Sequence, residues 1–451
     1  MFKCKAGFAG FGEVNTPIEL VNKLCSKAMG RLENIGFELV TTPAITDDEK
    51  GTDVKRAVND LKKDEFDFLI VCLTGWIPSH AVISVIGEFK HIPMILWGLT
   101  GEEIDGTWVA TAAQAGTTAL RKPMEDMGYK FTYIYEIPGG QPKNKEIEDF
   151  ARAASAVAAL KHAKVGQMGF RDMRLYGTMF DGVSLKGRIG VDVEFFEMLE
   201  IVQRMEKIDK NAVSKVVEKV KNDWVFEKDA NPESLELGAR VFLAIRDKAI
   251  ECGYDAVSLI DVDGMKKLLN FPPSMVFMLL ANETGLCTVP ENDTLGAVTQ
   301  LFCRYSTGQI AAYMEFYEFM EDRVLIGVPD YIPAEVTDGP VRVNPTSFGQ
   351  LGQGMLNVSK VKTGRATMCR LGSTGDRYMM QIITGEAVEP AKWEEAGWEP
   401  PAPQLPSLEF IMDTPVEEFA EKVMSQHCII TYGDNSAILK HMCKILEIEV
   451  I

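Results

Sequence analysis

The sequence predicts an α/β protein with two doubly wound parallel-sheet domains followed by a β-rich C-terminal domain. Through the first 330 residues, short apolar runs alternate with amphipathic helical patterns, which is typical of parallel sheets covered by helices on both faces. From residue 331 the chain is richer in Gly, Pro and Thr, and its apolar period approaches two, which indicates antiparallel strands. We expect the domains to span residues 1–160, 161–335 and 336–451.

In the first domain, strands and helices are expected to follow one another in a regular order. Apolar runs predict strands at residues 3–11, 37–41, 66–73, 92–97 and 130–135. Amphipathic stretches predict helices at residues 17–35, 53–63, 80–89, 108–127 and 145–162. Pro17 fits the first turn of its helix, where a missing N–H is tolerated.

The same patterns predict the elements of the other two domains. Strands are expected at residues 164–170, 255–260, 310–316, 360–371, 378–385 and 428–432. Helices are expected at residues 210–222, 233–252, 293–305, 415–426 and 436–446. Residues 390–406 contain five prolines and predict a wrapping loop.

Composition excludes several classes of function. The chain has 65 acidic and 47 basic side chains and a formal charge of −18, so binding to nucleic acid or to an anionic membrane is not expected. Its nine cysteines contain no C-x-x-C pair, which favours reduced thiols. The chain shows neither a signal-peptide core nor an apolar run of 18 residues. We therefore expect a cytoplasmic protein.

Three side chains stand out as candidates for chemistry. Glu291 precedes the helix that Asp293 is placed to cap, and its alternative interpretation is a solvated loop carboxylate. Glu315 interrupts an apolar strand, where a carboxylate needs a cation, a donor or a raised pKa; pairing with an arginine such as Arg304 is the alternative. His427 begins a late strand, where a purely structural hydrogen bond is the alternative.

Two carboxylates and one imidazole with open coordination positions would suit Mn²⁺ or Fe²⁺. The chain has only five histidines, so a site built from several imidazoles is not expected. A hydrolase G-x-S-x-G elbow, a Walker A loop and an H-E-x-x-H helix are all absent from the sequence.

At these residues the chain resembles the L-fucose isomerase and L-arabinose isomerase superfamily of metal-dependent ketol isomerases. The segment ENDTL at residues 291–295, followed about two dozen residues later by an acid in an apolar strand, is similar to the family pattern whose two acids bind manganese. The segment HCIITYG at residues 427–433 is similar to the one whose histidine is the third protein ligand.

The resemblance implies roles for particular residues. Glu291, Glu315 and His427 would bind the metal, which would be Mn²⁺ with Fe²⁺, Co²⁺ or Mg²⁺ as alternatives, and Glu291 and Glu315 would move protons. The sugar contacts would come from Trp76, His80, Asp261, Asp263, Asn292 and Gln426. Residues 260–265 read IDVDGM, where many members carry a Cys- or Gln-containing segment, so L-fucose itself is not implied.

The function implied by this resemblance is isomerisation of an aldose to a ketose through an ene-diol. The substrate would be a pentose, a 6-deoxyhexose or a modified hexose such as a sulfo-sugar. The resemblance also implies a homo-oligomer, which would be a hexamer, a tetramer or a trimer. Its sites would lie near subunit interfaces, where Trp76 and His80 of a neighbouring copy would help to close them. The alternatives are an epimerase or sugar-acid isomerase using the same site, and a non-catalytic sugar-binding protein.

Overall fold

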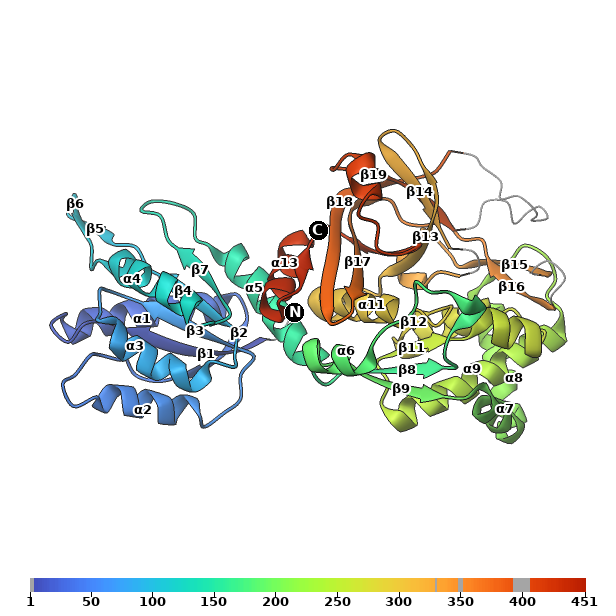
Figure 1. Cartoon of the computed structure of the whole chain (residues 1–451), viewed down its shortest axis with the longest axis horizontal. Coiled ribbons are helices and arrows are strands. Elements are labelled where there is room, and N and C mark those ends of the chain that lie inside the picture. Colours follow the sequence, from blue (N-terminus) through green and yellow to red (C-terminus); the bar gives the residue numbers. More distant parts are fainter. Residues whose placement is uncertain (1–3, 329–330, 348–351, 392–405) are drawn as a thin grey trace. The chain divides into compact units, whose positions relative to one another are not determined.

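The computed structural model describes residues 4–328, 331–347, 352–391 and 406–451 (Figure 1). The chain divides into two compact units, Met1–Ala158 and Ala159–Ile451, and each is described here by itself. The loop expected at residues 390–406 lies almost entirely outside the described residues. The boundaries expected for three domains stay a prediction.

The first unit contains a five-stranded parallel sheet with the strand order β2-β1-β3-β4-β7. Its strands are β1 (Cys4–Phe11), β2 (Phe37–Thr41), β3 (Phe68–Leu73), β4 (Met94–Gly98) and β7 (Phe131–Tyr135). Its helices are α1 (Ile18–Asn34), α2 (Thr52–Leu61), α3 (Ser79–Ile86), α4 (Ala113–Asp126) and α5 (Asn144–Leu160). The predicted alternation of strands and helices is confirmed for this unit.

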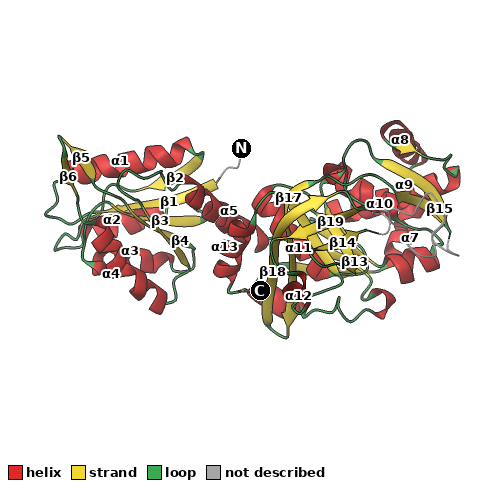
Figure 2. Cartoon of the chain, turned by 90° about the horizontal axis from the view of Figure 1, so that it is seen from above, coloured by secondary structure: helices red, strands yellow, loops and turns green. Residues whose placement is uncertain are grey.

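Helices cover both faces of this sheet, as expected for a doubly wound fold. All six residues of β3 are buried, because neither of its faces meets solvent. Leu69 and Val71 join an apolar cluster with residues of α2, α3 and α4, whereas Phe68 packs edge-on against Phe150 of α5. Figure 2 shows α1 on the side of the sheet opposite α2, α3 and α4.

Among the predicted boundaries of this unit, the start of helix α4 differs most from the expectation. The helix expected from residue 108 begins at Ala113, because residues 107–109 instead form strand β6 (Thr107–Val109) of a small hairpin with β5 (Glu102–Ile104).

The second unit contains a four-stranded parallel sheet with the order β12-β11-β8-β9. Its strands are β8 (Lys164–Met168), β9 (Asp192–Phe196), β11 (Ala256–Leu259) and β12 (Cys287–Val289). The associated helices are α6 (Gly182–Arg188), α7 (Met198–Lys207), α8 (Lys210–Asp223), α9 (Pro232–Cys252), α10 (Ser274–Leu279) and α11 (Thr294–Thr307). This sheet confirms the second parallel α/β layer.

The C-terminal part of the second unit is rich in β-structure, as predicted. Its strands are β13 (Ala312–Phe319), β14 (Arg323–Gly327), β17 (Gly364–Thr374), β18 (Arg377–Val388), β19 (Ser407–Met412), β20 (His427–Tyr432) and β21 (Glu449–Val450). The order β17-β20-β13-β14-β19-β18 is antiparallel throughout, and β18 pairs back onto β17, so six strands close into a barrel. Strand β21 pairs with β18 in parallel.

The remaining elements complete this unit. Strands β10 (Val225–Phe226), β15 (Arg342–Ser347) and β16 (Gln353–Asn357) form a small separate sheet. Helix α12 (Val416–Ala420) is much shorter than the helix expected at residues 415–426, whereas α13 (Ser436–Leu446) has its expected length. Residues 312–327, expected within the second α/β domain, hydrogen-bond in the barrel.

Helix α11 lies between the parallel sheet and the barrel. It contacts β8, β11 and β12 on one side and β17 and β20 on the other. Every residue from Thr294 to Cys303 is buried, which explains why this helix lacks a polar face. The start of α11 is thereby held where the end of β12 meets the barrel.

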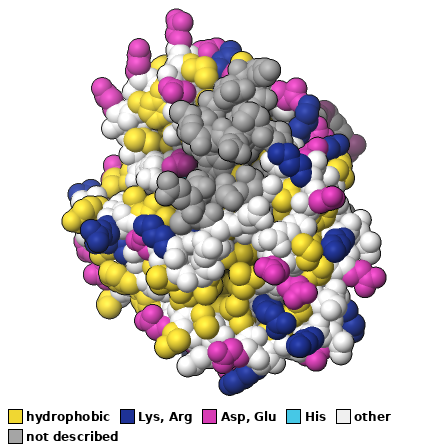
Figure 3. Space-filling model, turned by 90° about the vertical axis from the view of Figure 1, so that its right-hand side faces the viewer, with side chains coloured by type: hydrophobic (Ala, Val, Ile, Leu, Met, Phe, Trp, Pro, Cys, Tyr) yellow, Lys and Arg dark blue, Asp and Glu magenta, His cyan; other side chains and the backbone are white. Residues whose placement is uncertain are grey.

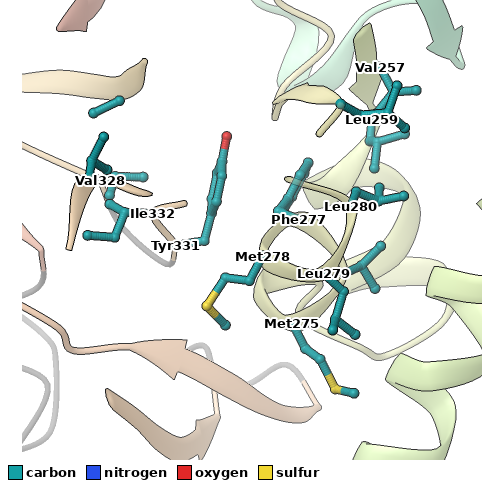
Figure 4. Close-up of a cluster of buried hydrophobic side chains, with 14 of the residues drawn as sticks. Val257, Leu259, Met275, Phe277, Met278, Leu279, Leu280, Val328, Tyr331 and Ile332 are labelled. Atoms are coloured by element: carbon teal, nitrogen blue, oxygen red, sulfur yellow. The ribbon is translucent and has the colours of Figure 1, made fainter. Parts of the chain in front are cut away.

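A hydrophobic core continues beneath this junction (Figure 4). Val257 and Leu259 of β11 belong to the same cluster as Phe277 of α10 and Val328 and Tyr331, which follow β14. The rings of Phe277 and Tyr331 stack with centroids 4.7 Å apart, and the Tyr331 hydroxyl donates to the carbonyl of Thr288 in β12. The parallel sheet and the segment after β14 therefore share one core.

On the face drawn in Figure 3, acidic and basic side chains are interspersed among apolar ones. No helix within the described ranges combines the length and apolarity that a bilayer crossing requires. All nine cysteines are free, as expected for reduced thiols.

Candidate active site

Acidic side chains gather at the carboxyl edge of the second parallel sheet, where β8, β11 and β12 end. Asp172 follows β8 and accepts hydrogen bonds from the amides of Val262 and Asp263, at 2.8 and 2.7 Å. Asp261 follows β11 and accepts from the amide of Glu291, which follows β12, at 2.8 Å. Loops at this edge of a parallel sheet commonly form ligand sites, and here the acids tie three such loops together.

These loops and the barrel enclose a small cavity. Its free volume of about 10 Å³ corresponds to the room of a single water molecule or ion. Its walls come from both layers, and the lining residues are Asp261, Lys266, Pro290, Glu291, Tyr313, Glu315, Val328 and His427. All three side chains predicted as metal ligands therefore line one cavity.

The antiparallel pairing of β13 with β20 brings two of these side chains together. Glu315 lies directly opposite His427 in the register. Their strand neighbours Met314 and Cys428 belong to the hydrophobic core, so alternate residues of both strands face the cavity and the core. The Tyr313 ring packs on the His427 imidazole with centroids 4.6 Å apart, which restricts the orientation of the imidazole.

The three predicted ligands converge on the side-chain amide of Gln426. Its Nε2 lies 3.2 Å from Glu291 Oε2, 3.3 Å from Glu315 Oε1 and 3.1 Å from His427 Nε2. The His427 Nε2 is also 3.4 Å from Glu291 Oε2. Within the described part of the chain, no three His, Cys, Asp or Glu side chains are already arranged to hold a metal ion.

A buried ion pair supports His427 from behind. The Arg370 guanidinium donates to both carboxylate oxygens of Asp293, at 2.6 and 2.7 Å. The Tyr313 hydroxyl donates to the same carboxylate, and His427 Nδ1 lies 3.3 Å from it. Burial alone would raise the pKa of Asp293, but Arg370 and then His427 hold that pKa well below its usual range. An ionised carboxylate facing Nδ1 favours the tautomer whose Nε2 lone pair points to the cavity.

The backbone at Glu291 is strained. Glu291 and Asn292 both have left-handed conformations, with φ of +60° and +56°, which is unfavourable for a glutamate. Asn292 holds this turn in place, because its side-chain amide donates to the Met168 carbonyl and its backbone amide donates to the Leu259 carbonyl. Such strain persists where the surroundings over-determine it, which is common at functional sites.

Negative charge accumulates around the cavity. Burial, followed by the charges of Asp261 and Glu315, raises the pKa of Glu291 to about 9. Burial, followed by the charge of Asp261, raises the pKa of Asp172 to about 7. Lys266 is buried with its Nζ 3.1 Å from Asp261 Oδ2 and lowers the pKa of Glu291 only in part. A bound cation would relieve this repulsion.

The other predicted sugar contacts have different positions. Asp261 lines the cavity, whereas Asp263 forms an ion pair with Lys267 and Asn292 anchors its own turn; neither is among the lining residues. Trp76 and His80 lie in the first unit, on the loop after β3 and in the first turn of α3, and the cavity is lined by residues of the second unit alone.

Four residues of this site were not predicted from the sequence: Asp172, Lys266, Tyr313 and Arg370. A signal existed for two of them. Arg370 interrupts an apolar strand just as Glu315 does, so it also required a buried partner. Asp172 follows a parallel strand at the edge where ligands bind. Nothing in the local sequence singles out Lys266 or Tyr313.

A parallel α/β sheet joined to a barrel, with two carboxylates and a histidine at their junction, agrees with the class of sugar isomerases that the sequence resembles. Residues 344–451 match the family described as L-fucose isomerase, C-terminal domain. The chain is 25% identical over 256 residues to L-arabinose isomerase of Shouchella clausii, which covers 54% of this chain and 51% of the relative.

The chain is also 21% identical over 454 residues to L-fucose isomerase of Vibrio vulnificus, covering 80% of this chain and 76% of that protein. The chain thus spans about half the length of the first relative and about three quarters of the second. A periplasmic solute-binding protein of Actinobacillus succinogenes with bound D-allose aligns over 68% of this chain and 92% of its own, at 12% identity and a TM-score of 0.17, which is too low to support any inference. The sequence matches confirm the predicted resemblance to the L-fucose and L-arabinose isomerase superfamily.

Proposed function

We propose that this chain is a cytoplasmic, metal-dependent aldose–ketose isomerase. The observation that carries the proposal is the position of Glu291, Glu315 and His427 around one cavity, with the three candidate ligand atoms within 3.3 Å of a single amide nitrogen. The names of the matched relatives support an isomerase acting on a sugar.

The donor set fits a divalent cation. Two carboxylate oxygens and one imidazole nitrogen suit Mn²⁺ or Fe²⁺, and Co²⁺ or Mg²⁺ are alternatives. Asp293 faces the far nitrogen of His427, the arrangement that typically orients a histidine ligand. Burial and the neighbouring charges of Asp261 and Glu315 raise the pKa of Glu291, and a cation bound there would offset both effects.

The chain's own residues supply the acid–base chemistry. A bound Mn²⁺ would polarise the sugar carbonyl and stabilise the negative charge that develops on the ene-diolate. Glu291 and Glu315 are the groups that would remove the proton at C2 and return it at C1. Lys266 lines the same cavity and would balance part of the charge that develops there.

The substrate class we propose is a pentose, a 6-deoxyhexose or a modified hexose such as a sulfo-sugar. The cavity described here holds no more than one small ion or water, so the sugar must bind at its outer side, beyond Gln426. We propose that a neighbouring copy in a hexamer, tetramer or trimer closes that side with Trp76 and His80. In support, Trp76 is 41% exposed and therefore accessible to a neighbouring copy.

Two measurements test the proposal. Metal analysis of the purified protein and titration of the metal-free protein with MnCl₂ are expected to show one bound ion per chain. Incubation with aldoses of the proposed classes in heavy water is then expected to place deuterium at C1 or C2. Absence of metal binding would refute the metal-dependent mechanism. Metal binding without exchange or isomerisation for any aldose would refute the isomerase activity and favour the sugar-binding alternative.

A further inference from the structure

Gln426, which is not among the residues that line the cavity, brings its side-chain amide against the three candidate ligands. Its Nε2 lies within 3.1–3.3 Å of the three candidate ligand atoms of Glu291, Glu315 and His427. In this orientation the donor end of the amide faces two carboxyl oxygens and a ring nitrogen, all of which can accept a hydrogen bond. The site is thus arranged around a positively polarised nitrogen.

This amide cannot satisfy the site fully. An NH₂ group has two hydrogens, whereas three acceptors face it, and all three distances exceed the usual value of about 2.9 Å. Gln426 is exposed, its contacts Glu291 and Glu315 are half-buried, and only His427 is buried. Its side chain can therefore rotate toward solvent without breaking a packed core.

A cation and the amide exclude each other. A divalent ion bonded to the same three atoms would approach the oxygens to about 2.1 Å, as Mg²⁺ does, whereas the amide nitrogen already lies among those atoms. We infer that Gln426 is a placeholder: in the metal-free protein its amide holds the three ligands together, and it must rotate away when the cation binds. This inference rests on the proposed function, because it requires a cation at this site.

The consequence is competition within one chain. Removing the amide takes its hydrogen bonds away from the three ligands, so it weakens the metal-free protein but removes the competitor of the cation. Substitution by alanine is therefore expected to tighten Mn²⁺ binding by about fivefold to tenfold, the size expected for the net loss of one ordinary hydrogen bond. A residue with a merely structural role would weaken both states.

The test compares metal-stripped native protein with Gln426→Ala and with Gln203→Ala, a control at an exposed glutamine on α7. Calorimetric titration with MnCl₂ gives the affinity, and thermal unfolding is measured with and without saturating Mn²⁺. We expect Gln426→Ala to bind Mn²⁺ more tightly, to unfold at a lower temperature without metal, and to regain that loss when metal is bound. Gln203→Ala should match the native protein in all three measurements.

The outcomes separate the two proposals. Unchanged or weaker Mn²⁺ binding by Gln426→Ala, with normal binding by the native protein, would overturn the placeholder while leaving the metal site intact. Equal stability of metal-free Gln426→Ala and the native protein would also overturn it. Failure of the native protein to bind Mn²⁺, Fe²⁺, Co²⁺ or Mg²⁺ would overturn the proposed metal site, and the placeholder with it.

Discussion

Replacement of Arg370 by methionine tests whether the buried ion pair holds the candidate site together. The Arg370 and Asp293 side chains are 4% and 0% exposed, and two hydrogen bonds join them. Methionine keeps most of the aliphatic stem but leaves the Asp293 carboxylate buried without its cation. Breaking such a pair from one side costs about 3–5 kcal/mol.

The chain offers a matched control in the same barrel. Arg365 on β17 also contacts Asp413 through the two terminal nitrogens of its guanidinium group, but these side chains are 43% and 47% exposed. An exposed pair is worth about 0.2–1 kcal/mol, because water and salt screen it. Arg365→Met should therefore lower the free energy of unfolding several-fold less than Arg370→Met.

Urea unfolding of the metal-free protein measures the loss of unfolding free energy in Arg370→Met and in Arg365→Met. The transition of the second unit is followed separately, because the two units can unfold independently. The double variant Asp293→Asn/Arg370→Met should lose less than the sum of its single variants, because no unpaired charge stays buried. Equal losses for Arg370→Met and Arg365→Met, or a loss below about 1 kcal/mol for Arg370→Met, would refute the reasoning.

Three further predictions concern the carboxylates. Glu291→Gln and Glu315→Gln should each lower turnover by at least about 10²-fold. The control Glu318→Gln, at an exposed position of the strand that carries Glu315, should leave turnover unchanged. Near-normal turnover of Glu291→Gln or Glu315→Gln would remove that residue from the mechanism. Mn²⁺ affinity should rise by about tenfold per pH unit up to about pH 9, because the cation must displace the proton of Glu291, whose pKa in the metal-free protein is about 9. Calorimetry in buffers of different ionisation enthalpy would count that proton, and binding at pH 7 without proton release would contradict this assignment. Finally, the raised pKa of Glu291 means that the folded protein disfavours the charged form of this side chain. Ionisation of Glu291 therefore lowers the free energy of unfolding. This loss is absent below about pH 4.5, grows as pH rises and is complete above about pH 9. Metal-free Glu291→Gln should therefore unfold at a higher temperature than the native protein at pH 9, with the gap closing near pH 5; a constant gap would show that charge is not its cause.

Local patterns were sufficient to predict the parallel sheets and to single out Glu315 as a candidate ligand. Strands buried on both faces are continuous apolar runs, as in β3, and such runs are visible in the sequence. Glu315 was recognisable because a carboxylate in an apolar strand requires a partner, and its position in the cavity agrees with that reasoning.

The barrel and the buried ion pair depend on contacts between distant segments. Strand β13 pairs with β20, more than a hundred residues away, and periodicity alone does not choose between that partner and a neighbour in the parallel sheet. Arg370, like Glu315, is a charged residue in an apolar strand and therefore required a buried partner. Its partner Asp293 already had a local explanation as a helix cap. The hydrogen bond that Asp293 accepts from the Gly296 amide confirms that cap. Because the helix cap already explained Asp293, there was no reason in the sequence to look for its second role as the partner of Arg370.

The pairing of Glu315 with His427 also limits which changes of chain length this protein can accept. Side chains alternate between the two faces of a strand, so deletion of one residue between Ala312 and Glu315 would turn the carboxylate toward the apolar core and bring a core residue to the cavity. The turn at residues 320–322 and the loop at 433–435 lie outside these pairings and can change in length without that effect. Engineering of this scaffold by insertion should therefore begin in those loops.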